Sequence, residues 1–114
     1  MRIAKFLLVG FVGLAGCKSV PPPTPLEQLN AQQMRGHGVY QAHCVVCHYD
    51  RRNGPLNGPS MLGVFKKPYL SSGAPANDER VTATILHGRN MMPAQANKLD
   101  AQDLEDLLAY LHTL

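Results

Sequence analysis

Tryptophan is absent from the 114-residue chain, and aromatic residues make up only 6% of it. A hydrophobic core built from side chains alone is therefore short of large rings, although 45% of the residues are hydrophobic. The length excludes a two-domain enzyme, because single domains commonly run to about 100 to 200 residues. We expect one small domain whose core contains something besides aromatic side chains.

A large excess of charge is also missing. The chain has 11 Lys and Arg residues against 8 Asp and Glu residues, a formal net charge of +3. Two of the cations, Arg2 and Lys5, lie in the first five residues, so the remainder is nearly neutral. This balance argues against nucleic acid as a partner.

No apolar run is long enough to cross a bilayer. Residues 6–15 form a ten-residue segment of apolar and glycine character, whereas a spanning helix needs about 20. A cationic start, a short apolar middle and small residues before a break are typical of a secretory signal. The sequence therefore predicts that the protein is exported.

The end of this segment, Leu14-Ala15-Gly16-Cys17, resembles the lipobox of bacterial lipoproteins, whose cysteine receives a diacylglyceryl group and becomes the new N-terminus. The resemblance implies that residues 1–16 are a signal peptide and that Cys17 is lipidated. It places the protein on the periplasmic side of a bacterial membrane, since two or more acyl chains anchor stably. The alternative is an ordinary cleavage nearby, with Cys17 removed or free.

Prolines 21, 22 and 23 favour an extended spacer, so residues 17–29 are expected to be a lipidated tether and residues 30–114 the folded domain. Two helix starts are possible, one at Thr24 with Glu27 and one at Asn30 with Gln33, because both resemble capping boxes. Either leads into a helix that runs toward Cys44. Gly36 and Gly38 weaken that helix, which close approach of another helix would explain.

Cys44-Val45-Val46-Cys47-His48 is a CxxCH motif, the attachment sequence of c-type haem. Two thiols form thioethers with neighbouring vinyl groups, and one turn of chain brings the following His to the iron. A disulfide, a redox CxxC and half of a zinc site are the competing interpretations. A zinc site needs about four ligands and the chain has no second Cys pair, and the βαβ pattern of a thioredoxin-like protein is missing. One lipidated and two haem-bound cysteines account for all three.

The second axial ligand is expected to be a methionine. Met92 is favoured over Met91 because Pro93 follows it and stiffens the loop, and a thioether paired with His raises the reduction potential. Met34 and Met61 are interpreted as core residues. The other candidates are the remaining histidines: His37, His43, His87 and His112.

The segment from Gln33 to Leu114 resembles the class I cytochrome c family, with Gly36, Tyr40 and the CxxCH residues at the family's positions. The resemblance implies an all-α fold of three to four helices around one covalently attached haem c. It also implies that the N- and C-terminal helices cross, with Gly36 and Tyr40 against Leu107 and Tyr110.

Residues 57–63 are similar to the family's Gly-Pro-x-Leu-x-Gly segment. The resemblance implies that the Pro59 carbonyl accepts a hydrogen bond from the axial His48, which would fix the orientation and basicity of the ring. Pro55 is the alternative acceptor, and a plain turn at Gly58-Pro59 is the simpler interpretation.

Two further helices follow from spacing alone. Residues 78–87 are bounded by Gly88. The last helix starts at Asp100 with Asp103 at its third position, and leucines recur at helical spacing as far as Leu111. The acidic residues near its start complement the helix dipole, and we expect them to be solvated.

The predicted function is one-electron transfer by a monomeric, membrane-tethered cytochrome c, with a redox protein as donor and another as acceptor. Two alternatives remain. A labile Met92 would leave an open iron for a peroxidase or gas sensor, and the protein could instead be an electron-transfer subunit of a larger membrane oxidoreductase.

Overall fold

The first long helix, α1 (Ala31–His43), begins at a capping box. The Asn30 side chain accepts a hydrogen bond from the Gln33 amide at 2.8 Å, and the Gln33 side chain accepts one from the Asn30 amide at 2.9 Å. Of the two starts that the sequence left open, the structure therefore takes Asn30. The earlier one yields only the short 3-10 helix η1 (Leu26–Gln28), which has no side-chain cap.

The structure is a computed structural model that describes residues 10, 13, 16–17 and 19–114, so most of the predicted signal peptide lies outside the described residues.

The other two helices also begin at a residue whose side chain caps the first turn. α2 (Asp78–His87) is capped by Asn77, whose side chain accepts from the Arg80 amide, and it ends at Gly88 with a positive φ of 75°. α3 (Ala101–Leu111) starts at a second capping box, between Asp100 and Asp103. Both helices confirm the sequence prediction, and the all-α class with three to four helices is confirmed as well. The described residues contain no strand beyond two isolated bridges.

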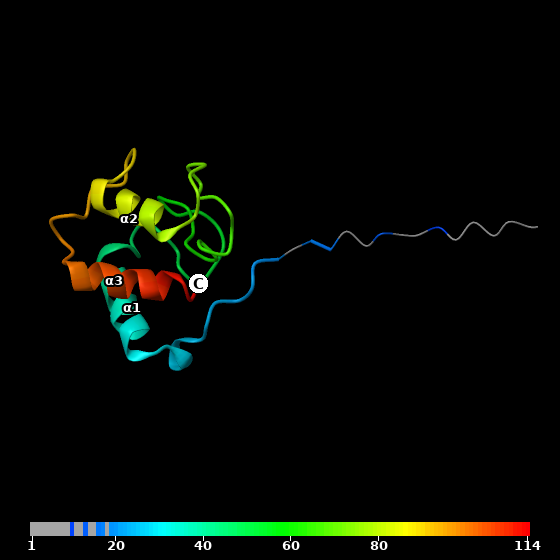
Figure 1. Ribbon diagram of the computed structural model, residues 1–114, viewed down its shortest axis with the longest axis horizontal. Coiled ribbons are helices and arrows are strands. Elements are labelled where there is room, and N and C mark those ends of the chain that lie inside the picture. Colours follow the sequence, from blue (N-terminus) through cyan, green and yellow to red (C-terminus); the bar gives the residue numbers. More distant parts are fainter. Residues whose placement is uncertain (1–9, 11–12, 14–15, 18) are drawn as a thin grey trace, which may run out of the picture.

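Helices α1 and α3 cross at close range, as Figure 1 shows. A Cβ atom at Gly36 would overlap the Asp106 carbonyl and lie 2.8 Å from Cβ of Tyr110. Tyr40 and Tyr110 meet edge to face, with ring centroids 5.7 Å apart, and Leu107 is fully buried. The predicted crossing is confirmed, and Gly36 is the residue that permits it.

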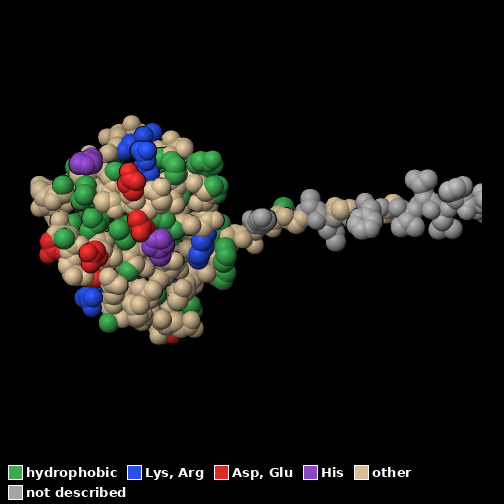
Figure 2. Space-filling view, in the orientation of Figure 1, with side chains coloured by type: hydrophobic (Ala, Val, Ile, Leu, Met, Phe, Trp, Pro, Cys, Tyr) green, Lys and Arg blue, Asp and Glu red, His purple; other side chains and the backbone are tan. Residues whose placement is uncertain are grey.

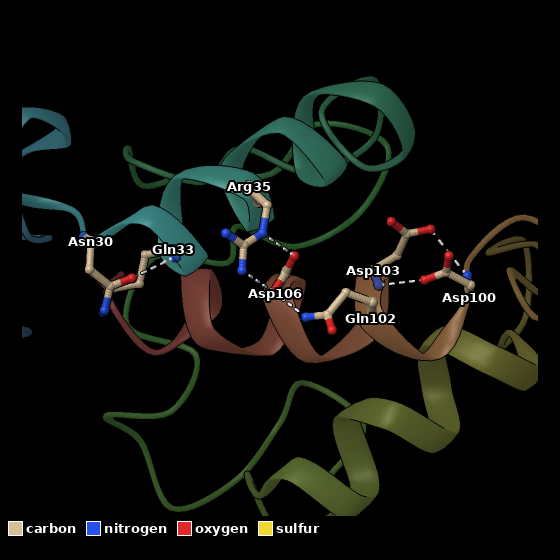
Figure 3. A network of polar contacts seen from close by, with 7 residues as sticks. All are labelled: Asn30, Gln33, Arg35, Asp100, Gln102, Asp103 and Asp106. Atoms are coloured by element: carbon tan, nitrogen blue, oxygen red, sulfur yellow. Dashed lines mark hydrogen bonds and ion pairs between the residues drawn. The ribbon is translucent and has the colours of Figure 1, made fainter.

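Asp106 corrects the expectation that the late acidic residues are solvated. It is only 3% exposed and accepts from Arg35 Nε on α1 at 2.9 Å and from the Gln102 side chain at 2.8 Å. Figure 3 shows this network across the two helices, with the capping boxes on either side. The pKa of Asp106 is lowered, chiefly by the hydrogen bond from Arg35. A buried carboxylate needs such a partner, so Asp106 ties the crossing together.

The core is completed by α2 and by loops from both sides of it. Its fully or nearly buried apolar residues are Tyr40, Val64, Val81, Ile85, Leu99, Leu107, Tyr110, Leu111 and Leu114. The start of α2 is joined to the end of the chain by a 2.7 Å contact between Asp78 and His112. His112 also stacks on Phe65, with ring centroids 3.9 Å apart.

The segment predicted to be a spacer contacts the folded body. The Thr24 amide donates to the Thr113 carbonyl at 2.8 Å, and Arg51 Nη2 donates to the Thr24 carbonyl at 2.5 Å. Both partners are distant in sequence, so no local pattern predicts these bonds. Among the described residues, no helix has the length and apolar character needed to cross a membrane.

Candidate functional site

The CxxCH residues form a tight turn directly after α1. The Cys44 amide donates to the Tyr40 carbonyl at 2.8 Å, which is the last hydrogen bond of the helix. The amides of Cys47 and His48 both donate to the Cys44 carbonyl, at 3.1 and 3.0 Å. This turn brings two thiols and one imidazole together within five residues. Cys44 and Cys47 are free and half-buried, so the structure does not pair them as a disulfide.

The surroundings of Cys44 and the described side chains bear on the redox and zinc alternatives in turn. Burial, and then the nearby Cys47, raise the pKa of Cys44 to about 11. The attacking cysteine of a redox CxxC has a lowered pKa, so the raised pKa of Cys44 argues against that alternative. The described residues also hold no group of three or more His, Cys, Asp or Glu side chains arranged for a metal ion. Two thiols beside a single His fit covalent attachment of a porphyrin better than either alternative.

The His48 ring is fixed by one hydrogen bond. Nδ1 of His48 lies 2.7 Å from the Pro59 carbonyl oxygen. Because a carbonyl only accepts, the ring donates from Nδ1, and Nε2 keeps its lone pair. That lone pair is the group that coordinates a metal, and the acceptor behind it increases its basicity.

Gly58 provides the space that this arrangement needs. A Cβ atom at residue 58 would overlap the His48 ring and lie 2.8 Å from Nδ1. The Gly58 amide also donates to the Cys47 carbonyl at 2.7 Å, which holds the 58–59 segment against the CxxCH turn. Gly58 and Pro59 therefore act together, one by lacking a side chain and the other by presenting its carbonyl.

Two tyrosines from the helix crossing hold the turn from behind. The Tyr40 hydroxyl donates to the His48 carbonyl at 2.6 Å, and the Tyr110 hydroxyl donates to Asp50 at 2.6 Å. Sequence reasoning missed Asp50 and this role of the tyrosines. No local signal marks Asp50, since its partner lies 60 positions later. The crossing of α1 and α3 is thus connected directly to the position of His48.

Met92 lies in a short hydrogen-bonded loop after α2. The Met92 amide donates to the Arg89 carbonyl at 2.9 Å, and the Arg89 amide donates back to the Met92 carbonyl at 3.1 Å. Asn90, inside the loop, takes a positive φ of 51°. Met92 is half-buried and packs against the core, whereas Met91 is 90% exposed. The two adjacent methionines therefore point into different environments.

The loop that follows Met92 is closed by Gln95. Gln95 is only 6% exposed. Its amide nitrogen donates to the Pro93 carbonyl at 3.2 Å, and its backbone amide donates to the Ile85 carbonyl at 2.9 Å. Gln95 thus fastens the Met92 loop to α2 with polar contacts.

Several of the other candidates for an iron ligand are exposed or contact other side chains, and His87 is among the exposed ones. His37 contacts Tyr110 edge to face, and His112 pairs with Asp78. Met34 is 43% exposed on α1, so its interpretation as a core residue was wrong, whereas Met61 packs partly buried against the core. Met61 and Met92 both pack partly buried against the core, whereas Met91 is exposed.

The match with known proteins settles the family. Residues 31–111 match the family model described as cytochrome c oxidase, cbb3-type, subunit III. The chain belongs to this family of mono-haem class I cytochromes c. The matched residues cover all three α-helices, the CxxCH turn and the Met92 loop. The cytochrome carries one covalently bound haem c, which gives it a role in electron transfer with redox partners.

Curated relatives agree with the family. A cytochrome c6-like protein of Nostoc sp. is 26% identical over 110 residues, which cover 96% of this chain and 90% of the relative. Cytochrome c6 of Thermosynechococcus vestitus is 25% identical over 107 residues, which cover 94% and 88%. A cytochrome c6 of Nostoc sp. is 29% identical over 83 residues, which cover 73% and 71%.

Proposed function

We propose that this cytochrome is an exported, lipid-anchored carrier of single electrons, in which His48 and Met92 ligate the haem iron on opposite faces. Cys44 and Cys47 form the thioether bonds, and Cys17 carries the lipid. Residues 1–16 are the signal peptide of the precursor, and the domain faces the periplasmic side of a bacterial membrane as a monomer.

The contrast between Met92 and Met91 carries the ligand proposal. Met91 is 90% exposed, so its sulfur faces water, whereas Met92 lies against the core beside α2. A thioether is a soft ligand that binds iron where water is excluded. The paired hydrogen bonds between Arg89 and Met92 hold the loop in one shape. These contacts support Met92 over Met91 as the proposed ligand.

The protein groups tune and protect a redox centre rather than react themselves. Bound haem supplies the ferric–ferrous couple. The Pro59 carbonyl orients the His48 ring, the Gln95 contacts hold the Met92 loop, and the buried faces of α1 and α3 keep the attachment turn from moving. Two ligands held by packed protein leave no open coordination position, which favours a carrier over a peroxidase or gas sensor.

Anchoring through Cys17 is supported by the distribution of thiols. Cys44 and Cys47 are half-buried in the haem-attachment turn, whereas Cys17 is exposed. It is therefore the cysteine available for acylation. The lipobox-like residues directly before it supply the processing signal.

The ligand assignment is tested by absorption spectroscopy of the protein from a host competent in haem maturation. The wild type should be low-spin in both oxidation states and show the near-infrared band of the iron–thioether bond in the ferric state. Met92→Ala should lose this band, and the neighbouring Met91→Ala should keep it. Loss in Met91→Ala with retention in Met92→Ala would transfer the ligand role to Met91.

The anchor is tested by intact mass and flotation with membranes. The wild type should carry a diacylglyceryl group and float with vesicles, and Cys17→Ser should do neither while keeping the same haem spectrum. A wild-type mass equal to the processed chain plus haem would overturn the anchor and leave the electron-transfer role in place.

The description of the matched family favours a second candidate, a subunit of a larger membrane oxidoreductase. Extraction of native membranes with a mild detergent, followed by size separation, distinguishes the two. A carrier elutes alone, whereas a subunit elutes with other redox polypeptides in fixed proportion.

A further inference from the structure

The N-terminal segment leaves the folded body at Val20, next to a turn that carries two lysines. Gly63 has a φ of +67° and no side chain, and a Cβ atom there would overlap Cγ1 of Val20. Val20 is accordingly half-buried on the bare surface of Gly63. The hydrogen bonds of Thr24 with Thr113 and Arg51 fix the segment a second time, four residues later.

These contacts shorten the tether. A free segment from Cys17 to Asn30 would reach about 45 Å when fully extended, because each residue spans at most about 3.3–3.6 Å. With Val20 held against Gly63, the free part of the tether is only the three-residue stretch of chain from Cys17 to Val20. Fully extended, this stretch reaches about 10 Å. A lipid on Cys17 would therefore hold the folded body at the membrane surface and present one side of it.

That side is basic. The Lys66 amide donates to the Gly63 carbonyl at 2.9 Å, so one turn both receives Val20 and presents the lysines. Lys66, Lys67 and Pro68 line a shallow hollow of about 620 Å³ together with Cys17, Ser19, Val20 and Pro21. Both lysines are exposed, and neither takes part in the ion pairs found among the described residues. Figure 2 shows Lys or Arg side chains beside the point where the N-terminal segment leaves the body.

We propose that the Lys66–Lys67 face, formed by these two lysines and Pro68 around the docked Val20, lies against anionic lipid headgroups and fixes the orientation of the cytochrome on its membrane. The inference rests on the proposed lipidation of Cys17. Lysines within a Debye length of an anionic surface are attracted to it, and a lipid anchor together with a basic patch binds more firmly than either alone. The docked segment brings the anchor and the basic patch to the same place.

The test uses the full-length lipidated protein with its haem, reconstituted in vesicles of phosphatidylcholine and phosphatidylglycerol at 3:1. A membrane-impermeant amine-acylating reagent is added, and modification of each lysine is followed by peptide mass spectrometry. Lys98, an exposed lysine next to α3, is the internal reference. Relative to Lys98, acylation of Lys66 and Lys67 should fall at least fivefold from detergent micelles to these vesicles, and it should fall less in phosphatidylcholine alone. An unchanged ratio overturns the proposal, and equal protection in both vesicles overturns the role of anionic lipid.

Variants of the docked segment test its part in the orientation. Val20→Asp places a carboxylate against Gly63 and should free the segment, so acylation of Lys66 and Lys67 should return toward the micelle rate. Ala83→Asp adds the same charge at an exposed position of α2 outside this hollow and should leave both lysines protected. Full protection in Val20→Asp would show that docking does not orient the body.

A wild type that fails to float overturns the anchor and this inference together, whereas flotation with unprotected lysines overturns only the inference.

Discussion

Gly36 on α1 passes the backbone of Asp106 on α3 so closely that a methyl group at position 36 would overlap the Asp106 carbonyl oxygen. The obstruction is backbone, so it cannot turn aside as a flexible side chain would. The position of α1 against α3 therefore depends on the absence of one Cβ atom. The same crossing supplies the Tyr40 and Tyr110 hydroxyls that hold the haem-attachment turn.

Gly36→Ala is expected to lower the free energy of unfolding by about 1–3 kcal/mol, as overpacking of a close contact does. The matched control is Gly38→Ala in the same helix, where a Cβ atom meets nothing within 4 Å. That change should stabilise the protein by up to about 1 kcal/mol, because alanine favours helix more than glycine does. Denaturant unfolding of the ferric protein measures both. Equal effects of the two substitutions would show that the crossing is not tight.

Asp106→Asn tests the buried pair with Arg35. Hydrogen bonding lowers the pKa of Asp106 in the folded state, so its contribution to stability is full above about pH 4 and is lost as the pH falls through the folded pKa. The variant should therefore be less stable than the wild type at pH 7, and the difference should shrink in acid. Glu105→Gln, on the exposed side of α3, should match the wild type. A gap between Asp106→Asn and wild type that stays constant from pH 7 to pH 3 would contradict this account.

Local sequence patterns predicted the helices well because caps and leucine spacing act within a few residues. Asp100 with Asp103 at the start of α3 and Gly88 at the end of α2 are such signals, and both formed as expected. The choice between Thr24 and Asn30 could not be made locally, because the Thr24 amide is bound by Thr113, 89 positions away. The resemblance to cytochromes c supplied the crossing at Gly36.

The site was predictable to the extent that its residues lie in one motif. CxxCH marks the attachment turn by spacing, and Met92 stands out by the proline after it. Asp50 and Gln95 carry no such mark, since what matters for each is a partner brought close by folding: Tyr110 for Asp50, and Ile85 for Gln95. The burial of Asp106 was missed for the same reason, because its partner Arg35 lies on another helix.

Tyr110→Phe is expected to change the response of the protein to alkali. Burial, followed by the hydrogen bond with Asp50, raises the pKa of Tyr110 well above its ordinary value. The unfolded chain loses the Tyr110 proton near pH 10, whereas the folded protein keeps it. The contribution of Tyr110 to the free energy of unfolding is therefore full below pH 10 and declines above it, by at most about 1.4 kcal/mol per pH unit. The variant should be less stable at pH 7 but lose stability less steeply between pH 10 and pH 11. Tyr69→Phe, at a tyrosine that is 63% exposed, is the control, and parallel curves for wild type and Tyr110→Phe would refute the assignment.

Gly58→Ala tests how the position of His48 sets the redox properties. The added methyl group would overlap the ring, so the ring must turn away from the Pro59 carbonyl. Because that hydrogen bond makes the imidazole more basic and so favours ferric iron, its weakening should raise the midpoint potential. Pro55→Ala, in the exposed part of the same loop, should leave the potential unchanged. Redox titration gives the potential, and the exchange rate of the His48 Nδ1 proton in the reduced protein, measured by NMR, reports the hydrogen bond directly. Faster proton exchange with an unchanged potential would show that the Pro59 bond orients the ring without tuning the iron.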